Sequence, residues 1–123
     1  MKIKQKQAVQ AFTSLVTIAR KPMPSFAAYK LFRLKKKLKD VVEFQTEQEN
    51  SIVEELGGKV LENGSVLFDD KTKYPEFAAR QKELDEMECE IEGDEKIIMV
   101  MKELPELSIA DLENLEPFID WKE

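Results

Sequence analysis

The pattern of hydrophobic and polar positions in the first 56 residues predicts two helices joined by a short link. Over residues 5–20 the apolar side chains recur at helical spacing and form one face. Residues 21–56 open with two prolines, contain no glycine, and carry an apolar stripe at spacings of three and four. Pro22 and Pro24 end the first helix, because proline disfavours helix in the residues before it, and Ser25 can cap the second. The short link favours an antiparallel helical hairpin.

The second predicted helix, residues 25–56, is the longest element of the chain. At about 1.5 Å per residue it would form a rod roughly 48 Å long, so other elements should pack along it. In residues 45–50 the sequence has glutamine where the stripe needs leucine. Either the stripe rotates there, or the helix projects beyond its packing partner into solvent. Gly57 and Gly58 end the helix, because glycine tolerates a left-handed backbone.

The pattern after residue 58 changes to short alternating and apolar runs, which predict a small sheet. Residues 59–61 and 66–68 flank Asn63–Gly64, a strong two-residue turn signal, and predict a β-hairpin. Two strands alone are marginal in water, so the hairpin needs a cover or a third strand. The candidate is the apolar run 97–101, which could equally be a buried helical turn. Three of its five residues are β-branched, which favours a strand.

Two further helices are predicted in the second half of the chain. Residues 75–92 begin with a proline suited to a first helical position and end at Gly93–Asp94. Residues 108–119 begin with Ser108 and Asp111 at the spacing of a capping box. Residues 1–4 alternate, and either form a short strand or fray.

These elements predict a helix-dominated α+β fold in a single domain spanning residues 1–123. It consists of a helical hairpin with one long helix, a small antiparallel sheet made of a hairpin with a candidate third strand, and two further helices. Within it, residues 1–56 form a basic helical hairpin. Residues 57–123 form an acidic part with the β-hairpin, a helix, a strand and a short C-terminal helix.

Charge is distributed unevenly between the two ends of the chain. Residues 1–40 hold eleven Lys/Arg and one acid, for +10, and residues 41–123 hold eight Lys/Arg and twenty-four acids, for −16. The two sum to the net charge of −6. Such halves can attract each other within the fold or between copies, and the basic half could bind an acidic partner. Because both halves must share one core, compensation within the fold is the preferred interpretation.

Composition argues against catalysis. The chain has no histidine, and so lacks the commonest general base and the commonest transition-metal ligand. Cys89 is the only cysteine, and its neighbours Glu88 and Glu90 disfavour a thiolate, so a buried structural role is expected. Adjacent carboxylates are expected by chance among 25 acids, and no phosphate-binding glycine loop is present. We therefore expect no enzyme, with no catalytic, cofactor-binding or metal-binding residue.

A basic run in the long helix is the most suggestive functional feature. Its members are Lys30, Arg33, Lys35, Lys36, Lys37 and Lys39. They surround much of the helix outside the leucine stripe and could bind phosphates or an acidic partner, with Tyr29 and Phe32 close enough to stack on bases. The alternative, which we prefer, is a solvated face paired with the acidic helix of residues 75–92.

A second candidate surface lies where the apolar stripe of the long helix is interrupted. It is a protein interface made of Phe44, Gln45, Gln48 and Ile52. There the intramolecular core is expected to give out, so that a partner would take over. No apolar run approaches the roughly 18 residues that a membrane span needs, and we expect an intracellular protein without a membrane partner.

Four segments carry a resemblance to a known group of proteins. They are K-P-M-P-S-F-A-A-Y-K-L at residues 21–31, the helix ending E-E-L-G-G, the Asn-Gly hairpin, and S-I-A-D-L-E-N-L-E-P-F-I at residues 108–119. In this order they resemble an uncharacterised family of small proteins from tailed-phage and prophage gene clusters.

The resemblance implies a non-enzymatic phage or prophage accessory or structural protein, in the cytoplasm of a bacterial host or associated with the virion. Such a protein would act by self-association as a homo-oligomer, or by binding another phage or host protein. The alternative is a nucleic-acid-binding protein that uses the basic face of the long helix.

Overall fold

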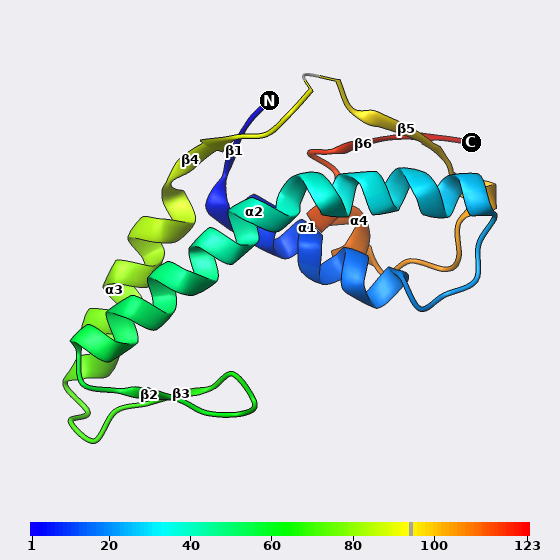
Figure 1. The fold of residues 1–123 in the computed structure, drawn as a ribbon. Coiled ribbons are helices and arrows are strands. Elements are labelled where there is room, and N and C mark those ends of the chain that lie inside the picture. Colours follow the sequence, from blue (N-terminus) through cyan, green and yellow to red (C-terminus); the bar gives the residue numbers. More distant parts are fainter. Residues whose placement is uncertain (94) are drawn as a thin grey trace.

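The computed structural model describes residues 1–93 and 95–123. The helices of this part are α1 (Gln5–Ile18), α2 (Ser25–Glu55), α3 (Lys73–Glu86), α4 (Ile109–Leu115) and the 3-10 turn η1 (Met101–Glu103). The strands are β1 (Lys2–Lys4), β2 (Lys59–Val60), β3 (Val66–Leu67), β4 (Glu88–Glu90), β5 (Ile97–Val100) and β6 (Ile119–Lys122). Figure 1 shows how they are arranged around α2. The helix-dominated α+β class is confirmed.

α1 and α2 form the predicted helical hairpin, and α2 is the long helix on which the rest of the fold is assembled (Figure 1). α1 stops at Ile18, shortly before the two prolines, as their missing amide donors and steric restrictions require. Pro24 occupies the N-cap position of α2, and Ser25 is its first helical residue rather than its cap. α2 bends gently and passes from one packing region to another (Figure 1).

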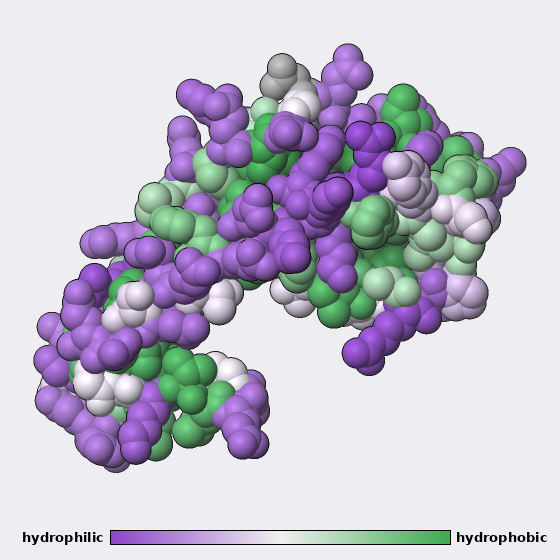
Figure 2. All heavy atoms as spheres, in the orientation of Figure 1, coloured by the Kyte–Doolittle hydropathy of each residue, from purple (hydrophilic) through white to green (hydrophobic). Residues whose placement is uncertain are grey.

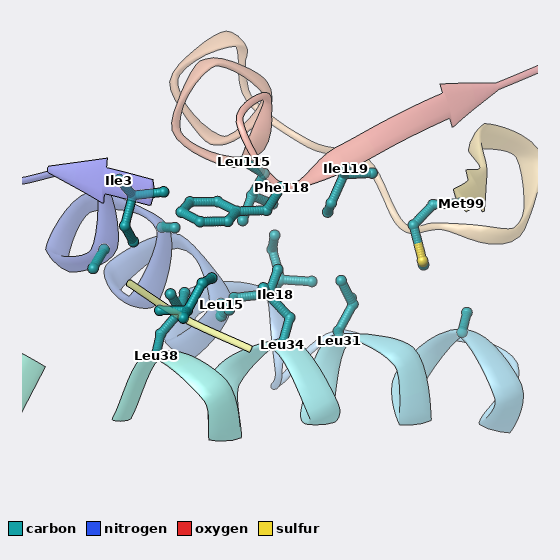
Figure 3. Packing of buried hydrophobic residues seen from close by; sticks show 14 residues of the cluster. Ile3, Leu15, Ile18, Leu31, Leu34, Leu38, Met99, Leu115, Phe118 and Ile119 are labelled. Carbon is teal, nitrogen blue, oxygen red and sulfur yellow. The ribbon is translucent and has the colours of Figure 1, made fainter. Parts of the chain in front are cut away.

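The main apolar core lies between α1, the N-terminal half of α2, and the C-terminal segment (Figure 3). Leu15 and Ile18 of α1 face the α2 stripe, and Phe118 and Ile119 cover them from the other side (Figure 3). α4 is fastened to α1 by a 3.1 Å hydrogen bond from Asn114 Nδ2 to Ser14 Oγ. The buried members are Ile3, Ala8, Ala11, Leu15, Ile18, Ala27, Leu31, Leu34, Leu38, Ile91, Met99, Leu115, Phe118 and Ile119.

A second and smaller apolar group lies at the far end of α2, where α3 and the hairpin are attached (Figure 1). Its buried members, outside the main core, are Ile52, Val53, Phe68 and Leu84. The ring of Phe68 lies edge-on to Tyr74, with 5.1 Å between centroids, and 5.9 Å from Phe77. The predicted hairpin is therefore attached to α3 through Phe68, whereas Val60, Leu61 and Leu67 of the hairpin remain exposed and no third strand pairs with it in the described residues.

The end of α2 follows the glycine geometry expected from the sequence. Gly57 has a φ of +78°, and its N–H donates to Glu54 O across 3.0 Å. The Gly58 N–H donates to Val53 O across 2.8 Å. This pair of bonds satisfies carbonyls that the helix end would leave unpaired, as in a Schellman motif.

The strands pair two by two. β2 and β3 form the predicted antiparallel hairpin, with Gly64 at φ +85° in its turn. Residues 97–100 are a strand, as preferred, but β5 pairs in parallel with β6 and not with the hairpin. β1 pairs antiparallel with β4, with Ile3 opposite Cys89, so the first residues form a strand rather than fray.

Two helices end earlier than the sequence predicts. α3 ends at Glu86 instead of residue 92, because Met87, Cys89 and Ile91 alternate along the strand that pairs with β1. α4 ends at Leu115, since Pro117 disfavours helix just before it, and residues 119–122 continue as β6. Ser108 and Asp111 form the predicted capping box. Of the predicted break at Gly93–Asp94, Asp94 lies outside the described residues.

Candidate functional site

The predicted protein interface on α2 is mostly occupied by α3 of the same chain. Gln45 and Ile52 are buried, with 2% and 5% exposure, which contradicts their assignment to a free surface. Gln45 Nε2 donates to Asp85 Oδ1 of α3 across 2.8 Å. Phe44 remains 40% exposed, and Gln48 is half-buried. The stripe is polar here because it meets a charged helix, and not because its packing partner ends.

The acidic helix α3 does not neutralise the basic run, so the preferred pairing is wrong. α3 packs along the C-terminal half of α2, where Gln81 and Arg80 contact Glu49 and Glu55. Glu86 of α3 pairs instead with Lys4 and Lys6, at 2.7 Å and 2.8 Å. Among the described residues, Lys39 is the only member of the basic run within 4.0 Å of a carboxylate oxygen.

That one ion pair is local to the helix. Lys39 Nζ lies 3.8 Å from Glu43 Oε1, one turn further along α2, and both side chains are more than half exposed. Surface pairs of this kind contribute little, about 0.3–0.5 kcal/mol. Apart from this pair, no carboxylate among the described residues neutralises the basic run.

Three exposed aromatic rings accompany this charge. Phe26, Tyr29 and Phe32 are 53%, 59% and 57% exposed. The rings of Tyr29 and Phe32 lie 6.3 Å apart at an interplanar angle of 27°, and the Arg33 guanidinium carbon is 6.0 Å from the Tyr29 centroid. With Lys36, these residues form what we call the aromatic–basic surface: Phe26, Tyr29, Phe32, Arg33 and Lys36. Phe26 did not figure in the sequence-based site.

Lys30, Lys35 and Lys37 of the basic run are held against the body of the protein. Lys30 Nζ donates to Ile98 O of β5 across 2.9 Å. Lys35 Nζ lies 5.5 Å from the centroid of the Phe12 ring of α1, within the range of a cation–π contact. Lys37 is half-buried. The structure thus divides the run into side chains that fasten α2 to its neighbours and side chains, notably Arg33 and Lys36, that point to solvent.

A shallow groove of about 660 Å³ runs beside the aromatic–basic surface. Glu90 and Glu92 also line it, so a ligand there would meet both signs of charge. The lining is Tyr29, Phe32, Arg33, Lys36, Lys37, Asp40, Val41, Glu90, Ile91 and Glu92. Such an open, mixed lining suits a polypeptide or a polymer better than an enclosed small molecule.

The structure offers little that resembles a reactive centre. Cys89 is half-buried beside the main core, and burial raises the pKa of its thiol, which favours the unreactive protonated form. Hydrogen bonds from Lys4 and then Lys6 lower the pKa of the Glu86 carboxyl to about 2, so this group stays ionised and serves as an ion-pair partner. Within residues 1–93 and 95–123, no group of three or more His, Cys, Asp or Glu side chains is arranged to hold a metal ion.

Comparison with known proteins gives no relative from which a role could be transferred. No family model, curated protein or solved structure matches the chain. No helix in the described part of the chain combines the length and the apolar character that a membrane span requires.

Proposed function

We propose that the protein is a non-enzymatic binding protein that acts through protein association, and that the aromatic–basic surface of α2 is its contact surface. The observation that carries this proposal is that Tyr29 and Phe32 are more than half exposed beside cations without a carboxylate partner among the described residues. Aromatic and Arg side chains are the residue types that supply most of the binding energy at protein interfaces.

The chemistry of this surface favours an acidic partner with apolar side chains. Arg33 and Lys36 provide fixed positive charge, which increases the association rate with a negative surface and makes it sensitive to salt. The aromatic rings provide contact area at little cost in side-chain entropy, because each has only two rotatable bonds.

A titration with poly-L-glutamate, followed by amide NMR, tests this proposal directly. At low ionic strength we expect shift changes concentrated in residues 26–39 and reduced by added salt, because the contact is between exposed charges. The variant Arg33→Glu/Lys36→Glu should lose the response, and Lys82→Glu on α3 should keep it. The absence of any response in the wild type at low salt would count against the proposal.

Single-stranded nucleic acid is the second candidate, favoured by the near-parallel Tyr29 and Phe32 rings beside Arg33. Stacking of a base on an aromatic side chain contributes about 1–3 kcal/mol. Fluorescence anisotropy with a labelled oligothymidine should then show salt-dependent binding that is weakened by Tyr29→Ser and abolished by Arg33→Glu/Lys36→Glu. No binding of the oligonucleotide at low salt would remove this candidate.

The biological setting that we propose rests on the resemblance of the sequence to proteins of phage and prophage gene clusters. On that basis the protein is a phage or prophage accessory or structural protein. It works in the cytoplasm of the bacterial host or in the virion, and its partner is a second copy or another phage or host protein. Placement of the gene among head, tail or early genes would test this setting.

A further inference from the structure

The charges of α2 are separated at a single point in the helix. Residues 25–39 carry six basic and no acidic side chains, and residues 40–55 carry six acidic and no basic side chains. The helix as a whole is therefore neutral, but its two halves are not. The boundary lies between Lys39 and Asp40.

This order of charge is opposite to the one that would stabilise the helix itself. The N-terminal end of a helix favours negative charge and the C-terminal end favours positive charge. α2 has no acidic residue in its first turn and no basic residue in its last. The helix dipole therefore does not explain the separation of charge. Among the described residues, α3 bonds to α2 through Gln45, Glu49 and Glu55, in the acidic half.

Both halves contribute to one exposed face of α2. Tyr29, Lys36, Asp40, Glu43 and Glu47 follow one another at spacings of seven, four, three and four, which places them on one side of the helix. All five are exposed, and they lie opposite the buried stripe of Leu31, Leu34 and Leu38. Figure 2 shows hydrophilic side chains dominating the face along which α2 runs in Figure 1.

We propose that a second copy of this chain binds this face through its own α2, in antiparallel orientation. The two-fold axis passes between Lys39 and Asp40 of each copy. This inference rests on the proposed function, and names a second copy as the protein partner of a face that shares Tyr29 and Lys36 with the aromatic–basic surface. An antiparallel arrangement is the one that places the basic half of each helix on the acidic half of the other.

The register follows from the position of the axis. Lys36 of one copy faces Glu43 of the other, and the same contact is made a second time across the axis. Phe32 faces Glu47, one position from Arg33, so the aromatic–basic surface of one copy lies against the acidic half of the other. In a parallel arrangement Lys36 would face Lys36, and every such pair would repel.

The contact is expected to be weak and reversible. Its centre is charged rather than apolar, and the pairs remain open to solvent at the edges, so added salt screens them. The exposed rings of Tyr29 and Phe32 lie toward each end of the contact and exclude water there. Such an interface suits an assembly that forms at high local concentration.

Sedimentation equilibrium of charge-reversal variants tests the antiparallel pairing. At about 50 mM salt we expect the wild type to form a dimer that dissociates at about 0.5 M salt. Lys36→Glu and Glu43→Lys should each raise the dimer Kd about tenfold or more, since each creates two like-charged pairs. Lys82→Glu and Glu83→Lys on α3 are the matched controls and should leave the Kd unchanged.

Mixing the two variants gives the decisive result. Lys36→Glu mixed with Glu43→Lys should form a heterodimer, and the double variant Lys36→Glu/Glu43→Lys should again form a homodimer. A wild-type dimer whose variants fail to associate on mixing would overturn this register. Should either variant fail to fold by circular dichroism, Arg33→Glu and Glu47→Arg repeat the exchange one turn away.

These measurements distinguish failure of the proposed dimer from failure of the proposed binding surface. A wild type that stays monomeric at low salt, but responds to poly-L-glutamate in residues 26–39, would overturn the dimer and leave the binding surface. A monomer that instead binds the oligothymidine through Arg33 and Lys36 would overturn the dimer in favour of nucleic acid. A monomer that binds neither polymer would overturn both proposals.

Discussion

The buried amide of Gln45 joins α2 to α3 by donating from Nε2 to Oδ1 of Asp85 across 2.8 Å. The other end of the same amide has no partner: Oε1 of Gln45 is buried and accepts no hydrogen bond from any described residue. An unpaired buried polar atom costs about 1–3 kcal/mol. One side chain therefore makes a favourable contact and an unfavourable one at the same place.

Replacement of Gln45 by leucine is expected to stabilise the protein. Leucine restores the apolar stripe and removes the unpaired Oε1, and Asp85 is half-exposed and can be hydrated instead. We expect a gain of about 1 kcal/mol in the free energy of unfolding from urea denaturation. Gln45→Ala is the control, and should destabilise because it leaves a cavity. A Gln45→Leu variant less stable than the wild type would contradict this account.

Acid should weaken the fold partly through Glu86. Lys4 and Lys6 hold the pKa of its carboxyl at about 2 in the folded protein, below its ordinary value of 4.5. The folded state therefore binds this proton less readily than the unfolded state. The stabilising contribution of Glu86 is complete above pH 4.5 and is lost as the pH falls towards 2.

Thermal unfolding of Glu86→Gln between pH 2 and 7 checks this dependence. The difference in Tm between wild type and variant should be largest above pH 4.5 and should shrink as the pH approaches 2. Glu83→Gln, on the same helix, has no ion pair among the described residues and should follow the wild-type curve. If the difference in Tm between the wild type and Glu86→Gln stays constant over this pH range, the ion pairs do not act as described.

Gly58 is required by the position of the hairpin rather than by its own backbone angles. A Cβ at this position would overlap the ring of Phe68, which is buried in the small apolar group at the end of α2. Gly58→Ala should destabilise the protein by about 1–3 kcal/mol, the usual cost of overpacking. Gly64→Ala, where a Cβ would meet open space at a φ of +85°, should cost about 1 kcal/mol. Equal losses in urea denaturation would argue against a steric role for Phe68.

The exposed aromatic rings should be dispensable for folding. Tyr29→Ser and Phe32→Ser are expected to change the free energy of unfolding by no more than about 0.5 kcal/mol, because both rings are more than half exposed. Phe118→Ala, at 2% exposure in the main core, should cost about 3–5 kcal/mol. A large loss of stability in either serine variant would show that these rings support the fold rather than a partner.

The helices and the turn signals were predictable because their information is local. Two prolines, a pair of glycines, an Asn-Gly turn and a capping box determine where the elements begin and end. The strands β4 and β6 were missed because each depends on a distant partner. Residues 87–91 fit a helical stripe as well as an alternating strand, and only pairing with residues 2–4 decides between them. Before β6, Pro117 is a local signal that the helix beginning at residue 109 ends before residue 117.

The candidate site was predictable in part. The basic run and its two aromatic neighbours were visible in the sequence, but their exposure depends on where α3 packs. The polar residue Gln45 in the apolar stripe was interpreted as part of a free protein interface. Its actual partner, Asp85, lies forty residues away in the sequence, so the neighbouring residues gave no sign of it. The separation of Arg33 and Lys36 from the lysines that fasten α2 to β5 and α1 is likewise a property of tertiary packing.

The unequal size of the two apolar groups gives the ends of α2 different resistance to local unfolding. Among the described residues, the main core buries fourteen apolar side chains, whereas Ile52, Val53, Phe68 and Leu84 are the four buried outside it, at the far end. Regions with few buried contacts open at lower free energy than the whole molecule. The far end of α2, α3 and the hairpin should therefore exchange their amide hydrogens by fluctuations that leave the N-terminal half of α2 intact. The proposed contact surface would then stay rigid while the other end of the protein opens and closes.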